Sequence, residues 1–129
     1  MLNKFLTQAL FDDFARAGVV LIKSLFAEFV ETLCAGIDFN MANPGPFASE
    51  YVHKQEKRRF FDDYCNWERI PEFEKVIGTS EVAAVAANLM QSRTVQLFHD
   101  HVLVKNRELQ SQHRGIRMDH IILLKDRKQ

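Results

Sequence analysis

Two pairs of side chains in the sequence have types and a spacing that can do chemistry. His99 and His101 are two residues apart, so on an extended strand both imidazoles point to one face, where they can share a metal ion. Asp62 and Asp63 precede Tyr64 and offer paired carboxylates for acid–base work. Neighbouring residues in a chain rarely face one site, however, and the histidines lack a third ligand at metal-site spacing. We therefore expect structural roles for both pairs and predict neither a catalytic residue nor a metal ligand.

Composition excludes several classes of protein. Lys and Arg together number 17, as do Asp and Glu, so the chain lacks the net charge that favours nucleic acid or an acidic membrane surface. No apolar run approaches the ~20 residues of a membrane span, and the amino terminus makes a poor signal peptide. Cys34 and Cys65 are too few for a disulfide framework. We expect a cytoplasmic protein with reduced thiols, without nucleic-acid or membrane partners.

The helices and strands that position these residues can be predicted from hydrophobic periodicity and from helix-breaking residues. Helical spacing predicts a helix that ends at a Gly18 cap, a second that ends before Asn43, and another that Ser80 caps. The full prediction is helices over 4–17, 27–40, 71–77 and from 80, a polar loop over 47–59, and strands over 19–22 and 93–105. Two strands cannot make a sheet that hides its edges. The fold class is therefore α+β, and the chain resembles the opening of a domain.

The composition changes abruptly at Asn106. All eleven Phe, all Val and all three Pro precede this residue. The last 24 residues carry six basic and three acidic side chains, whereas the first 105 carry eleven basic and fourteen acidic ones. An acidic, Phe-rich chain thus becomes basic and Phe-free at one point, and this break divides it into segments 1–105 and 106–129.

Several sequence blocks before this break occur in a familiar order. They are Phe14-Ala15-Arg16-Ala17-Gly18-Val19-Val20-Leu21-Ile22-Lys23, Asn43-Pro44-Gly45-Pro46, Phe60-Phe61-Asp62-Asp63-Tyr64-Cys65-Asn66-Trp67 and Phe98-His99-Asp100-His101-Val102-Leu103-Val104-Lys105. In order and spacing, residues 8 to 105 resemble the amino-terminal portion of the phytanoyl-CoA dioxygenase family. The last block is similar to the strand that precedes the metal motif in that family.

The resemblance implies a double-stranded β-helix (jelly-roll) oxygenase, of which this chain holds the amino-terminal helices and first strands. Such enzymes use Fe(II), 2-oxoglutarate and O2 to hydroxylate a small-molecule substrate. The resemblance also implies that His101 faces the cosubstrate and that Lys105 lies on the strand leading to the metal motif. These two residues are the cofactor-binding candidates.

The family's iron ligands are missing from this chain. They come from a Trp-His-x-Asp motif after the strand of Lys105 and from a distal histidine, but no histidine here is followed two residues later by Asp. A one-base frameshift accounts for the break. Synonymous codons can be chosen for Asn106 to Gln129 that, read after insertion of one G, give E-P-G-T-A-K-P-T-P-W-H-Q-D-G-P-Y-Y, which contains the motif. We therefore predict an out-of-frame tail and a truncated, inactive chain that binds neither Fe(II) nor 2-oxoglutarate tightly.

An alternative is a small non-catalytic interaction module. Its tail from Asn106 would be a genuine basic segment that docks a partner through Ile121-Ile122-Leu123-Leu124. Six basic residues interspersed with three acids are too dilute to favour RNA as that partner. The sequence leaves the substrate and the oligomeric state open.

Overall fold

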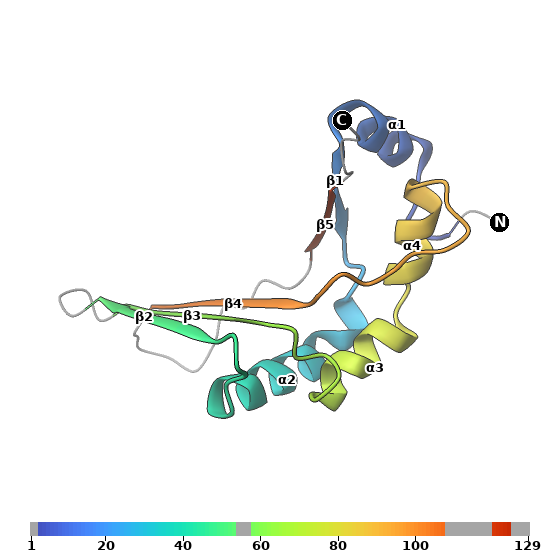
Figure 1. The fold of residues 1–129 in the computed structure, drawn as a ribbon. Coiled ribbons are helices and arrows are strands. Elements are labelled where there is room, and N and C mark those ends of the chain that lie inside the picture. Colours follow the sequence, from blue (N-terminus) through green and yellow to red (C-terminus); the bar gives the residue numbers. More distant parts are fainter. Residues whose placement is uncertain (1–2, 54–57, 108–119, 125–129) are drawn as a thin grey trace. The chain divides into compact units, whose positions relative to one another are not determined.

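A computed structural model describes residues 3–53, 58–107 and 120–124 of the chain (Figure 1). The elements are α1 (Gln8–Ala17), β1 (Val19–Lys23), a 3-10 turn (Ala27–Phe29), α2 (Val30–Ala42), β2 (Ser49–His53), β3 (Arg58–Tyr64), α3 (Pro71–Thr79), α4 (Val82–Leu89), β4 (His101–Arg107) and β5 (His120–Leu124). Helices and antiparallel strands are mixed, which confirms the α+β class. Among the described residues, no helix is both long and apolar enough to cross a membrane. The chain divides into two compact units.

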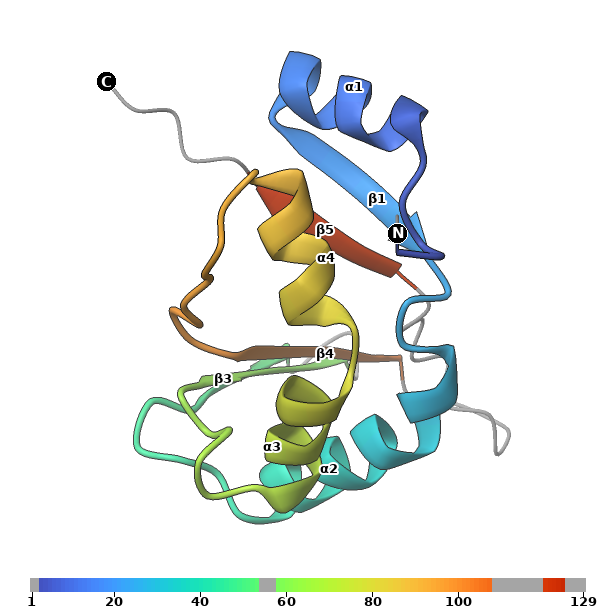
Figure 2. The ribbon, with the colours of Figure 1, turned by 90° about the vertical axis from the view of Figure 1, so that its right-hand side faces the viewer.

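The first unit, Met1–Val30, Ile77–Gln96 and Arg117–Gln129, contains α1, β1, α4 and β5. Helix α1 begins after Thr7, whose hydroxyl accepts the Leu10 N–H at 3.3 Å. It ends as predicted at Gly18, which adopts the left-handed conformation with φ 73°. Figure 2 shows α1 and α4 beside β1. Their packing forms an apolar core of Leu6, Phe14, Val20, Ile22, Leu25, Val85 and Leu89.

Strand β1 confirms the strand predicted over 19–22 and is buried on one face alone. Val20 and Ile22 point into the core, while Val19 and Leu21 are 38% and 45% exposed. The strand pairs antiparallel with β5, from Val19 opposite Leu124 to Lys23 opposite His120. No element was predicted from the sequence for this part of the tail.

The second unit, Glu31–Val76 and Leu97–Ile116, contains a three-stranded antiparallel sheet in the order β2-β3-β4. Helices α2 and α3 lie along one face of this sheet (Figures 1 and 2). Buried Phe61 of β3, Ile37 of α2 and Phe73 of α3 form the apolar part of this layer. The two helices pack closely at Gly36, where a Cβ atom would lie 2.6 Å from the Phe73 ring. The predicted helices over 27–40 and 71–77 correspond to α2 and α3.

The predicted loop over residues 47–59 is wrong, because β2 and the start of β3 form a hairpin there. Ser49 pairs with Asp62 and His53 pairs with Arg58. Strand β3 lacks the alternation that marks a strand, since its neighbours come in like pairs: Arg58-Arg59, Phe60-Phe61 and Asp62-Asp63. Each face of the strand therefore carries one Arg, one Phe and one Asp, and no alternation of polar and apolar residues appears in the sequence.

The predicted strand over residues 93–105 starts too early. Strand β4 begins at His101, opposite Tyr64, and extends to Arg107. Its partner β3 ends at Tyr64, so residues before His101 have no strand to pair with. Asp100 instead bonds to the turn that follows β3, because its carbonyl accepts the Cys65 N–H at 3.1 Å.

Candidate functional site

The sheet of the second unit has an exposed face opposite α2 and α3. We define this open face by Tyr51, Phe60, Asp62, Tyr64, His101 and Leu103. The pairs Tyr51–Phe60, Asp62–Leu103 and Tyr64–His101 stand opposite each other in register, and alternate residues of a strand share a face. Tyr51 is 64% exposed and Leu103 is 58% exposed, whereas Phe61 and Val102 on the other face are buried.

Two histidines gather around Tyr64 at one end of the open face. The ring centroids of His99 and His101 each lie 5.7 Å from that of Tyr64, and they are 6.0 Å from each other. His101 Nε2 contacts the carboxylate of Asp62 by a hydrogen bond. On the other side of the cluster, the Phe47 ring stacks on Tyr64 with centroids 4.9 Å apart. Both histidines predicted to share a face are thus close together, although His99 precedes the strand.

Ligands for a metal ion do not converge here. Within the described residues, no group of three or more His, Cys, Asp or Glu side chains is placed to hold one. Asp62 and Asp63 point to opposite faces of the sheet: Asp62 contacts His101, while Asp63 is fully buried. The two carboxylates therefore do not form a common acid–base site.

Lys105, the second cofactor-binding candidate, lies in β4 opposite Phe60. It is four residues beyond His101 on the same strand, with Leu103 between them. Its side chain lies outside the described part of the structure. The tail assigned to a frameshift also lies mostly outside the described residues, apart from Asn106 and Arg107 at the end of β4 and the strand β5.

A buried polar cluster on the other face of the sheet was missed by the sequence analysis. Asp63 Oδ2 accepts hydrogen bonds from Asn40 Nδ2 and from the Gly45 N–H, both at 2.8 Å. Arg69 Nε donates to Asn66 Oδ1 at 2.7 Å, and its Nη2 lies 3.9 Å from Asp63 Oδ2. Asn40, Asp63 and Asn66 have no exposed surface. The cluster joins α2, the loop at Gly45 and the turn after β3, so its role is to hold the sheet on its helices.

Hydrogen bonds to Asp63 keep its carboxyl ionised. Burial alone raises the pKa of this group. Hydrogen bonds from the Asn40 side chain and the Gly45 backbone outweigh the burial, with further bonds from Asn66 and Tyr64, so the pKa lies below its ordinary value of 3.8. An enclosed carboxylate that stays ionised at neutral pH is suited to structure and not to proton transfer.

Asp100 anchors the turn between β3 and α3, a role that the sequence analysis also missed. Its Oδ1 accepts the N–H groups of Asn66 and Trp67, each at 2.9 Å. This turn includes Cys65 in the left-handed conformation, with φ 63°. In the sequence, the only sign of this role is an Asp between two histidines, and that pattern does not indicate which groups the carboxylate binds.

Comparison of the chain with models of known protein families, with curated proteins and with solved structures found no match. The class that the described residues define is an α+β protein whose second unit presents an aromatic, histidine-bearing sheet face.

Proposed function

We propose that this chain is the amino-terminal part of an oxygenase of the phytanoyl-CoA dioxygenase type, and that its reading frame departs from that of the parent after Lys105. The parent would hydroxylate a small molecule with Fe(II), 2-oxoglutarate and O2. Two features of the sequence support the proposal: the resemblance of residues 8 to 105 to that family, and the fact that synonymous codons can be chosen for Asn106 to Gln129 that give a Trp-His-x-Asp motif when one base is restored.

The open face is consistent with this proposal. One face of the sheet packs on α2 and α3, whereas Tyr51 and Leu103 on the other remain more than half exposed. In a jelly roll, a second sheet packs over such a face at about 10 Å and encloses the site. The open face also carries His101, the residue that the resemblance implies for the cosubstrate.

The residues that the structure describes do not fit an iron centre. His101 is engaged with Asp62, and the described residues supply no convergent third ligand. The proposal therefore assigns the chemistry to the parent protein and expects no turnover by this chain. Iron-dependent succinate production by purified chain 1–129 would contradict that expectation.

The decisive test is the source DNA on both sides of the Lys105 codon. A single restored base, followed by an open frame that contains a distal histidine and arginine, would establish the parent oxygenase. The restored protein should release succinate in an Fe(II)-dependent manner. His101→Ala in that protein should raise the KM for 2-oxoglutarate, whereas His53→Ala, in β2 of the same unit, should leave it unchanged. An in-frame gene with no oxygenase sequence downstream would overturn the proposal.

One observation favours the alternative of a non-catalytic interaction module. Strand β5, which lies in the tail, pairs along its whole length with β1. An adapted tail is expected to complete a sheet in this way, and an intact gene ending after Gln129 would support it. Deleting residues 120–129 should then destabilise the first unit, because β1 would lose its partner strand.

A further inference from the structure

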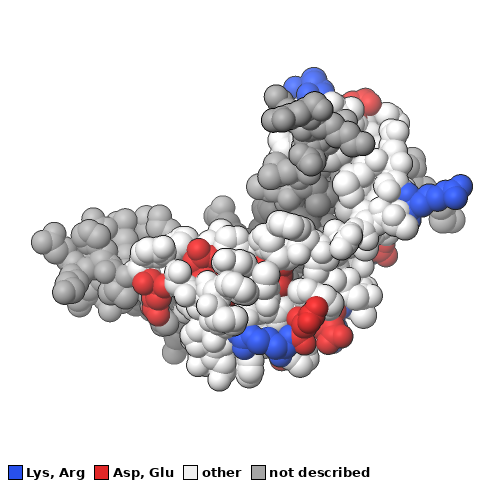
Figure 3. Space-filling model, in the orientation of Figure 1, with Lys and Arg blue, Asp and Glu red and all other residues white. Residues whose placement is uncertain are grey.

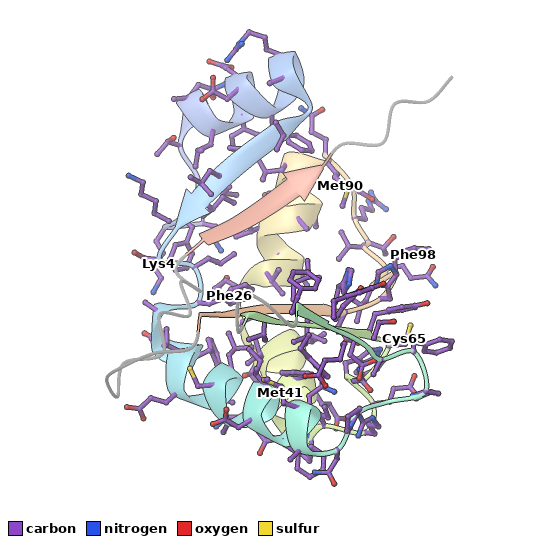
Figure 4. The ribbon with its side chains drawn as sticks, turned by 90° about the vertical axis from the view of Figure 1, so that its left-hand side faces the viewer. Lys4, Phe26, Met41, Cys65, Met90 and Phe98 are labelled. Carbon is purple, nitrogen blue, oxygen red and sulfur yellow. The ribbon has the colours of Figure 1, made fainter. Side chains whose placement is uncertain are left out.

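We draw no further inference here: the strongest candidate, the open face of the three-stranded sheet together with the exposed ring of Phe98 beside it (Figure 4), carries nothing, because nothing in the described part of the structure shows what covers this face, and the charged side chains on the side that Figure 3 draws do not select a partner for it.

Discussion

Asn40 and Asp63 are 23 residues apart in sequence, and their side chains meet in the interior of the second unit through a hydrogen bond of 2.8 Å. Neither residue has any exposed surface. The bond joins helix α2 to strand β3, so a polar contact, and not only apolar packing, fixes the helix against the sheet. Its energetic consequences can be tested one residue at a time.

Replacing the carboxylate should damage the fold of the second unit. Asp63→Asn keeps the shape of the side chain but presents an amide to the donors of Asn40 and Gly45, which then lose a charged acceptor in a buried place. We expect a loss of about 3 kcal/mol in the free energy of unfolding, measured by urea denaturation. Asp62→Asn, at the half-buried residue on the opposite face, should cost less than half as much.

Acid should destabilise the protein through the same group. The folded-state pKa of Asp63 lies below its ordinary 3.8, so the folded state holds this proton more weakly than the unfolded chain does. The resulting stability is fully present above about pH 4 and is lost as the pH falls through the folded-state pKa. Urea midpoints measured from neutral pH down to pH 3 should fall, and they should fall less steeply in Asp63→Asn. Equal slopes in both proteins would rule this group out as the cause.

Two helix ends were predictable from sequence because their signals are local. Gly18 ends α1 and Pro44 follows the end of α2, and each acts through its own backbone geometry. Ser80, by contrast, is not the N-cap of α4 as predicted, since that residue is Glu81, which makes no side-chain capping bond. The hairpin of β2 and β3 was not predictable in the same way. Its ladder depends on register with β4, which is supplied by residues some 40 positions later in the chain. Local alternation was the only available signal, and the paired residues of β3 conceal it.

The same difference between local and tertiary signals separates the parts of the candidate site that could be predicted from the parts that could not. His99 and His101 were found close together because two residues of spacing already determine their proximity. The cluster of Asn40, Asp63 and Asn66 was missed because it forms only when α2 and the turn after β3 meet the sheet. Buried polar residues give no periodic signal, so only tertiary structure reveals that they share hydrogen bonds.

Gly45 offers a test of how tightly that cluster is packed. A Cβ atom at this position would lie 2.4 Å from Asn66 Oδ1 and 3.1 Å from Asp63 Oδ2. Gly45→Ala should therefore cost about 1–3 kcal/mol, since the polar side chains must move away from their partners. Gly78→Ala, in helix α3, meets nothing within 4 Å and should instead stabilise by up to about 1 kcal/mol. Thermal unfolding of the two variants should thus shift in opposite directions; a shared direction would contradict the packing described.

Substitution by glycine should raise the free energy of unfolding at one cysteine and lower it at the other. Cys65 occupies the left-handed region with φ 63°, where a side chain is strained, so Cys65→Gly should gain about 0.5 kcal/mol. Cys65→Val should lose about 1–2 kcal/mol, because a branched side chain tolerates this conformation least. Cys34 lies inside α2, where Cys34→Gly should lose about 0.3–0.5 kcal/mol of helix propensity. Urea denaturation of the three variants measures these signs. A loss for Cys65→Gly as large as that for Cys34→Gly would mean that the thiol of Cys65 makes contacts outweighing the backbone strain.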